Sequence, residues 1–153
     1  IKLLFKEYKT ITFILLHGLY IAFKRMKFYH ADIHEDNMML QVIRPTKTVR
    51  LQTREGLFEI PAGTTRFVPK LIDYGLSSIE KSNEFLVEFA QDDISSVKNE
   101  ILERLRFDGT DSPNSEIYQF FESKPFYNIF DAETEFDHLV AMDMLLESDF
   151  FAE

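Results

Sequence analysis

Residues 29–37 of this 153-residue chain read YHADIHEDN and carry six polar side chains between two apolar segments. Before them, apolar residues recur at helical spacing from Tyr8 to Lys27, which predicts one long and mostly buried helix. After them, the run Met38 to Ile43 is short and stops at Arg44-Pro45, which predicts a strand. Polar groups between two buried elements must be hydrogen-bonded or functional, because burying them unpaired is costly.

A second polar stretch follows two further β segments. Residues 48–60 alternate in the manner of strands around Arg54-Glu55-Gly56, and Pro61-Ala62-Gly63 is a turn, so this pattern predicts a hairpin at about residues 48–63. A short strand is expected at Phe67–Ile72, and it leads directly into Asp73-Tyr74-Gly75.

The rest of the chain predicts helices. Ile94, Val97, Ile101 and Leu105 recur at helical spacing within a helix expected at residues 92–105. Two more helices are expected at about residues 114–123 and 132–147, separated by Lys124-Pro125. The sequence as a whole predicts one domain of α+β class, mainly helical with small β-hairpins.

Several interpretations of residues 30–37 follow from the residues alone. One is a capped turn, in which Asp and Asn side chains bond their own backbone. Another is a metal site, because His30, Asp32 and His34 would project from one face of an extended segment, and such a trio can hold zinc or iron. The chain has no cysteine for a Cys-based zinc site, and the remaining histidines, His17 and His138, do not lie in a ligand-like cluster.

A third interpretation, phosphoryl transfer, accounts for more residues. The spacing His30-x-Asp32-x-x-x-x-Asn37, followed downstream by Asp73-Tyr74-Gly75, resembles the catalytic loop and metal-binding triplet of protein kinases. This chemistry needs a carboxylate near the acceptor hydroxyl and oxygen ligands for magnesium. The resemblance implies ATP and Mg²⁺ as cofactors. It also implies that Asp32 accepts the proton of the acceptor hydroxyl, while Asn37 and Asp73 hold the metal ions that bridge the nucleotide phosphates.

The same resemblance assigns supporting roles. Asp93 opens a buried helix and is similar to the kinase aspartate that anchors the backbone of the catalytic loop around His30. Gly75 is expected to let the backbone turn sharply behind Asp73. The resemblance covers about residues 8–107 and is to the C-terminal, substrate-binding lobe of kinases, with its β-hairpins at the nucleotide cleft.

Departures from the usual kinase pattern refine this expectation. His34, which is assigned to catalysis with Asp32, stands where typical serine/threonine kinases have Lys, whereas aminoglycoside and choline phosphotransferases and other atypical kinases often have a polar residue or histidine. The 36 residues from Asn37 to Asp73 exceed the usual spacing because of the hairpin at 48–63. A hairpin in this place is similar to serine/threonine kinases of large DNA viruses. No Ala-Pro-Glu segment follows Gly75, so a phosphorylation-controlled activation loop is not expected.

The 29 residues before His30 contain no glycine-rich loop and no strand lysine with a helix glutamate partner, the parts that grip the nucleotide in kinases. We therefore expect the chain to be inactive alone and to need the N-lobe of a longer parent protein. Two alternatives stay open. One is a truncated, non-catalytic kinase lobe that binds or inhibits a partner, and the other is a small-molecule phosphotransferase of the aminoglycoside type.

Composition restricts the partners. The formal net charge of −9 argues against general binding to nucleic-acid phosphates. Residues 1–72 carry 12 Lys and Arg against 6 Asp and Glu, which predicts a locally positive site on an acidic protein. The longest apolar run, Ile11–Phe23, is shorter than the roughly 20 residues of a membrane span, so no membrane partner is expected. A protein substrate or regulator, and an intracellular location in the host cytoplasm or virion, are the corresponding expectations.

Overall fold

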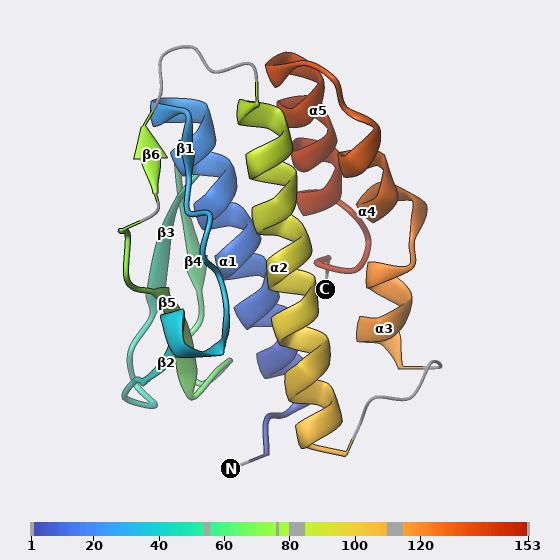
Figure 1. Ribbon diagram of the computed structural model, residues 1–153. Helices are drawn as coiled ribbons and strands as arrows, with labels where there is room; N and C mark the ends of the chain where they lie inside the picture. Colours follow the sequence, from blue (N-terminus) through green and yellow to red (C-terminus); the bar gives the residue numbers. More distant parts are fainter. Residues whose placement is uncertain (1, 54–55, 76, 80–84, 110–114, 153) are drawn as a thin grey trace.

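The computed structural model describes residues 2–53, 56–75, 77–79, 85–109 and 115–152. Figure 1 shows the β elements on one side of two long helices and shorter helices on the other side. The predicted α+β class, with small antiparallel β elements and a large helical part, is confirmed.

The central element is α1, Phe5–Met26, which contacts β elements on one side and two other helices on the other. Its apolar stripe faces the core, as the periodicity predicts, and the buried residues of the stripe are Tyr8, Ile11, Leu15, Leu16, Leu19, Tyr20 and Phe23. The helix begins before the predicted start because Glu7 Oε1 accepts the backbone N–H of Leu4 at 2.9 Å and satisfies a free donor of the first turn. It ends at Lys27, whose backbone is left-handed with φ 52°.

The strands of two β pairs follow the sequence prediction closely. The strand β2, Met38–Val42, pairs with β5, Phe67–Leu71, and β3, Val49–Thr53, pairs with β4, Gly56–Ile60. Both pairs are antiparallel. The hairpin predicted at residues 48–63 is therefore confirmed, although its turn residues 54 and 55 lie outside the described residues.

A third pair was not predicted. The strand β1, Phe28–Tyr29, pairs with β6, Ser78–Ile79, just before the polar loop at residues 30–37. Each strand has only two residues, so neither shows a period that sequence reasoning can recognise. The polar loop itself closes with a short 3₁₀ helix, η1, Glu35–Asn37.

The second long helix, α2, spans Leu86–Phe107 and starts six residues before the predicted position. Leu86 and Ala90 are buried against Phe23 and Tyr29 in a small apolar cluster. Burial of these residues stabilises the added turns, because removing apolar surface from water outweighs the weak local pattern.

The chain ends in shorter helices that pack on the far side of α2 from the β elements (Figure 1). They are α3, Glu116–Phe121, then α4, Lys124–Asn128, which continues into the 3₁₀ turn η2, Ile129–Asp131, and finally α5, Glu135–Leu146. Lys124-Pro125 was expected to separate two helices but begins one, since proline in the first turn lacks only an N–H that would be unpaired there.

The aromatic-rich stretch from Tyr118 to Phe130 contributes to the core. Phe120, Phe121 and Phe126 are buried in the main apolar cluster together with residues of α1, α2 and α5. Among the described helices, none has both the length and the hydropathy needed to cross a bilayer.

Candidate functional site

Antiparallel pairing of β2 with β5 brings two of the predicted site residues together. Met38 lies opposite Leu71, and the ladder continues by one bond, in which the N–H of Ile72 donates to the carbonyl of Asn37 at 2.8 Å. Asn37 and Asp73, which are far apart in sequence, therefore lie at the same end of one two-stranded ladder.

Asp93 connects the polar loop to α2. Its side chain is buried, and its two carboxylate oxygens accept the backbone N–H groups of His30 at 2.6 Å and Ala31 at 2.9 Å. Burial raises the pKa of Asp93, and the two backbone donors oppose that rise because they stabilise the charged form. The anchoring contact expected from the sequence is present.

The buried imidazole of His30 connects the loop to the end of β5. Its Nδ1 accepts the N–H of Asp32 at 3.2 Å, so Nε2 carries the proton and donates to the carbonyl of Ile72 at 2.9 Å. Ser77 Oγ donates to the carbonyl of His30 at 3.1 Å. His30 is thereby bonded to residues on both sides of Asp73, namely Ile72 before it and Ser77 after it. Sequence reasoning missed the role of Ser77, since a serine in a loop carries no recognisable signal for a backbone contact.

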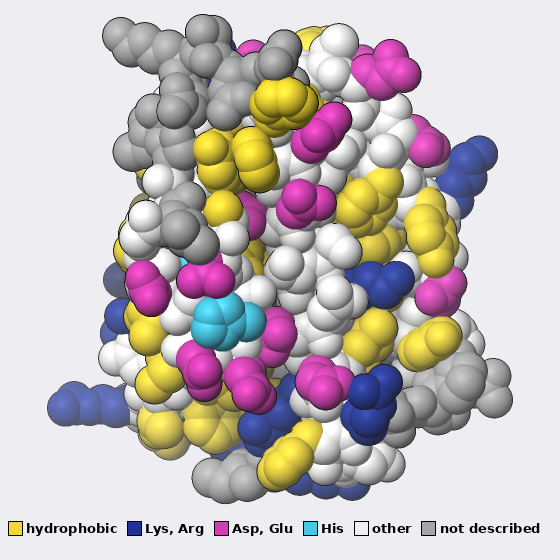
Figure 2. Space-filling model, viewed as in Figure 1, with side chains coloured by type: hydrophobic (Ala, Val, Ile, Leu, Met, Phe, Trp, Pro, Cys, Tyr) yellow, Lys and Arg dark blue, Asp and Glu magenta, His cyan; other side chains and the backbone are white. Residues whose placement is uncertain are grey.

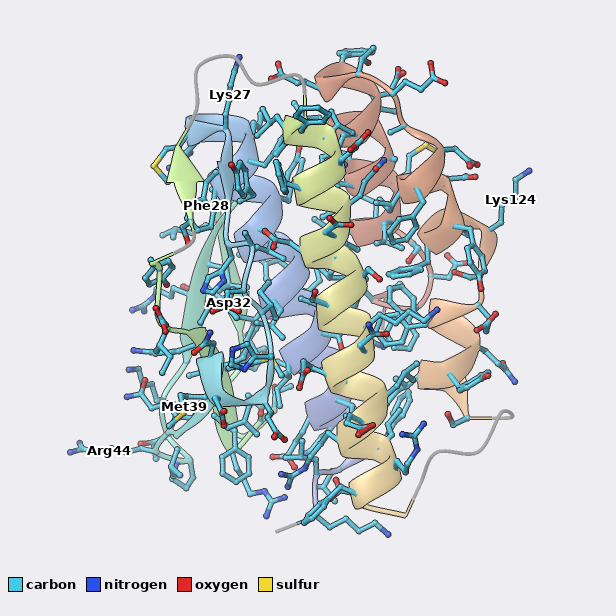
Figure 3. The ribbon with its side chains drawn as sticks, in the orientation of Figure 1. Lys27, Phe28, Asp32, Met39, Arg44 and Lys124 are labelled. Atoms are coloured by element: carbon cyan, nitrogen blue, oxygen red, sulfur yellow. The ribbon has the colours of Figure 1, made fainter. Side chains whose placement is uncertain are left out.

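Asn37 and His34 orient the carboxylate of Asp32 (labelled in Figure 3). The Nδ2 group of Asn37 donates to the carbonyl and to Oδ2 of Asp32 at 2.8 and 3.0 Å, and it also lies 3.0 Å from His34 Nε2. His34 Nδ1 accepts the N–H of Asp36 at 3.3 Å, and its Nε2 lies 3.4 Å from Asp32 Oδ1. Each oxygen of the Asp32 carboxylate therefore has a side chain of the same loop beside it.

Two non-glycine residues at the site have left-handed backbone conformations. The φ angles are 69° at Ala31 and 58° at Asp73. Such conformations cost about 1–3 kcal/mol each and persist only where surrounding contacts hold them. Here Asp93 bonds the N–H of Ala31, and His30 bonds the carbonyl immediately before Asp73. The strain and the contacts that maintain it thus coincide with the predicted site.

Gly75 lies in a tight turn behind Asp73, as the sequence predicted. The N–H of Ser77 donates to the carbonyl of Tyr74 at 3.0 Å and closes this turn. The left-handed residue is Asp73, and Gly75 is not among the described residues with positive φ. Gly75 also leaves space for the carboxylate, because a Cβ atom there would stand 3.3 Å from Asp73 Oδ1, which accepts the N–H of Gly75 at 3.3 Å.

The zinc or iron trio is not assembled. His30 is buried and directs Nε2 to a backbone carbonyl, away from a shared ligand position with Asp32 and His34. Throughout the described residues, no group of three or more His, Asp and Glu side chains is placed to hold a metal ion. This interpretation of the loop is therefore wrong.

The two residues expected to hold magnesium differ in exposure. Asp73 is exposed, whereas Asn37 is 5% exposed and uses its amide nitrogen on Asp32, and within the described part of the chain no hydrogen bond occupies Asn37 Oδ1. Magnesium is bound by few protein oxygens and keeps water and phosphate oxygens as its other ligands. The donor set of Asn37 and Asp73 fits such an ion.

Acidic side chains surround the outer face of the site. Figure 2 shows acidic side chains gathered around a histidine on this face. Burial, followed by repulsion from Glu35 and Glu103, raises the pKa of Glu100 on α2. A hollow of about 630 Å³ lies beside these carboxylates, between α1, β2 and α2. The sequence predicted a locally positive site. The hollow is lined by charges of both signs, since Glu35, Glu100 and Glu103 lie there together with Arg104 and Arg106.

Comparison of the chain with models of protein families, with curated proteins and with solved structures finds no match. The assignment of function therefore depends on the residues and geometry of the site.

Proposed function

We propose that this chain is the C-terminal lobe of an atypical serine/threonine protein kinase, and that its site transfers phosphate from magnesium-bound ATP to a protein hydroxyl. The observation that carries the proposal is the buried Asp93 carboxylate, which holds the backbone of the loop that contains Asp32 and Asn37. The β2–β5 register places Asp73 at the end of the same ladder.

Each side chain has a chemical role in this proposal. Asp32 orients the acceptor hydroxyl and accepts its proton, and its oxygens are preset by Asn37 and His34. Asn37 and Asp73 supply oxygen ligands for magnesium, which neutralises charge on the phosphates when it is bound. The extra hairpin of β3 and β4 supports the atypical, virus-like subclass, because it accounts for the long interval between Asn37 and Asp73.

A second candidate function is that of a non-catalytic kinase lobe that binds a partner. The observation that favours it is the exposed apolar face of α5, on which Phe136 and Met144 are 73% and 61% exposed. Such a surface serves association rather than catalysis.

The catalytic proposal is tested with Asp32→Asn in the longer protein that carries the N-lobe. Transfer of labelled phosphate from ATP to a protein acceptor should fall by about 10²–10⁴-fold, because the substitution removes the proton acceptor and keeps the size of the side chain. Asp36→Asn is the matched control, since this exposed carboxylate lies in the same loop. Equal rates for Asp32→Asn and the unaltered protein would leave the non-catalytic lobe as the better account.

Metal binding can be measured on the present chain. Mn²⁺, a paramagnetic substitute for magnesium, should broaden the NMR signals of the Asn37 side-chain amide and of residues 72–75 first. Asp73→Asn should remove this selective broadening while Asp36→Asn preserves it. Uniform broadening over the acidic surface would count against a magnesium site.

A further inference from the structure

One face of α5 is apolar and exposed. Phe136, Val140 and Met144 follow one another at intervals of four residues and are 73%, 42% and 61% exposed. Side chains at this spacing form one continuous stripe on a helix. The opposite face of α5 is used for packing, since His138, Met142 and Leu145 are buried. The helix is therefore apolar on two sides, and only one of them has a partner within the described residues.

The stripe borders a groove. The groove has a volume of about 440 Å³ and lies between α5 and α4, where Pro125 and Asn128 form its other wall. Figure 1 shows α4 and α5 as neighbours on the side of the fold away from the β elements and from the candidate kinase site. Contiguous apolar surface of this kind marks interaction sites in proteins. The flexible thioether of Met144 suits such a surface, because it can adapt to the side chains of a partner.

The charges around the groove are of one sign. Asp137, near the start of α5, and Asp149, just after its end, both line the groove, and no Lys or Arg is among the described residues that line it. Residues 115–152 contain nine Asp and Glu and a single basic residue, Lys124. The apolar stripe is thus bounded at both ends by carboxylates within a strongly acidic part of the chain.

The carboxylates of Asp137 and Asp149 favour some binding partners of the groove over others. A second copy of this chain that presented the same face would bring its own carboxylates against Asp137 and Asp149, and like charges at an interface are repulsive. An anionic membrane surface would be repelled in the same way. A cationic partner is attracted, and its charges meet the carboxylates while its apolar side chains fill the groove.

We propose that the groove between α4 and α5 binds an amphipathic helix of another protein, whose apolar side is bordered by Lys or Arg. A helix fits because ridges of side chains spaced by four residues interdigitate with those of another helix. The partner buries its apolar side on Phe136, Val140 and Met144, and its cations lie near Asp137 and Asp149. This proposal is independent of the kinase activity proposed above, since it uses none of the residues of that site.

The test uses the whole chain and a synthetic probe. A fluorescent peptide of about 16 residues, slightly longer than α5, carries Leu and Phe at intervals of four and Lys on both borders. Fluorescence polarisation should show saturable binding that weakens as salt is raised, because the charges are partly screened. A peptide with the same apolar residues and Glu in place of Lys should bind about tenfold more weakly or worse. Equal binding of the two peptides overturns the proposal.

Two variants locate the site. Val140→Asp combined with Met144→Asp should weaken binding of the Lys peptide by about tenfold or more, because the complex loses its central apolar contacts. Asp137→Lys combined with Asp149→Lys should reverse the preference toward the Glu peptide without removing apolar area. The matched control is Val42→Asp, because Val42 is 72% exposed on β2, outside the groove. Circular dichroism melting shows whether each variant is folded.

Other outcomes identify other occupants. If the chain alone sediments as a dimer that the Val140 and Met144 substitutions convert to a monomer, the groove binds a second copy and the proposal is wrong. Binding of the Lys peptide that is unaffected by both groove variants also overturns it, because the peptide then binds elsewhere on the acidic surface.

Discussion

At the scale of single residues, the loop of the candidate site is held by two buried side chains that bond the backbone. Asp93 accepts two backbone N–H groups of the loop, and His30 donates to the carbonyl of Ile72. The buried side chains of Asp93 and His30 fix the backbone of the site. The carboxylates of Asp32 and Asp73 take no part in these bonds, and Asp32 is partly exposed whereas Asp73 is exposed. Removing a buried carboxylate that accepts such bonds leaves the backbone N–H donors unpaired, so the substitution should lower stability strongly.

We expect Asp93→Ala to lower the free energy of unfolding by about 2–4 kcal/mol, because the N–H groups of His30 and Ala31 lose their acceptor in the protein interior. Urea denaturation followed by circular dichroism measures this change. Asp92→Ala is the matched control, since Asp92 is exposed on the same helix and should change stability by less than about 0.5 kcal/mol. Equal effects of the two substitutions would show that the anchoring bonds contribute little.

At the scale of elements, one ion pair fixes the start of α1 to the start of β5. Glu7 on α1 accepts the backbone N–H of Arg66 at 2.8 Å and pairs with its guanidinium at 2.7 Å. Glu7 also accepts the N–H of Leu4, so one buried carboxylate serves as helix cap, ion-pair partner and connection to β5. Because β5 leads into Asp73, this contact contributes to the position of the site.

The Glu7 contact predicts a specific loss of stability in acid. The hydrogen bond from Arg66 lowers the pKa of Glu7 from 4.5 to about 2. A lowered pKa in the folded state stabilises the protein above the unfolded value, and the gain is lost as pH falls from about 4.5 toward 2. The Arg66 side chain is half exposed, so solvent screens the ion pair and reduces this stabilisation. We expect the pair to contribute about 1–2 kcal/mol to the free energy of unfolding at neutral pH.

Urea denaturation of Glu7→Gln between pH 7 and pH 2 measures this loss. The difference from the unaltered chain should be largest above about pH 5 and should disappear near pH 2. Glu59→Gln is the control, because its pair with Arg50 is exposed and should be worth little. A difference that does not change with pH would mean that packing, and not charge, explains the effect of Glu7.

At the scale of the whole molecule, α1 joins the β elements and α2 to the C-terminal helices. Phe23 of α1 packs against His138 of α5, with ring centroids 4.6 Å apart. His138 is buried, and its Nδ1 has no hydrogen-bond partner among the described residues. Packing of the helices therefore requires an uncharged imidazole.

Acidification should consequently weaken the contact between α1 and α5. Burial lowers the pKa of His138 from 6.5 to about 4, so the folded state loses stability as pH falls from 6.5 toward 4. The expected loss is about 2–3 kcal/mol. Thermal melting from pH 7.5 to pH 4 should show a smaller decrease for His138→Leu than for the unaltered chain.

Two comparisons make this measurement specific. Burial also lowers the pKa of His17, so part of the decrease should remain in His138→Leu. His34→Gln is the second comparison, because the His34 side chain is 46% exposed and lies in the polar loop rather than between α1 and α5. If His138→Leu shows an unchanged pH dependence, the carboxylates rather than this buried histidine are responsible for it.

The sequence by itself determined the elements and the residue types of the candidate site. The stripe of α1, the hairpin of β3 and β4, and the strand that leads into Asp73 follow from local period and turn chemistry, which act over a few residues. The position of Asp93 on a buried helix was also predictable, since apolar residues follow it at helical spacing.

Only the tertiary structure decided how these parts meet. The β2–β5 register sets Asn37 beside Asp73, the direction of the His30 imidazole excludes the metal trio, and the early start of α2 depends on a cluster shared with α1. The tertiary structure also leaves one apolar side of α5 exposed among acidic residues. The sequence alone showed only that this part of the chain is helical and rich in Asp and Glu. The physical reason is the same in each case: burial and pairing between segments that are distant in sequence outweigh local preference, and no local pattern records them.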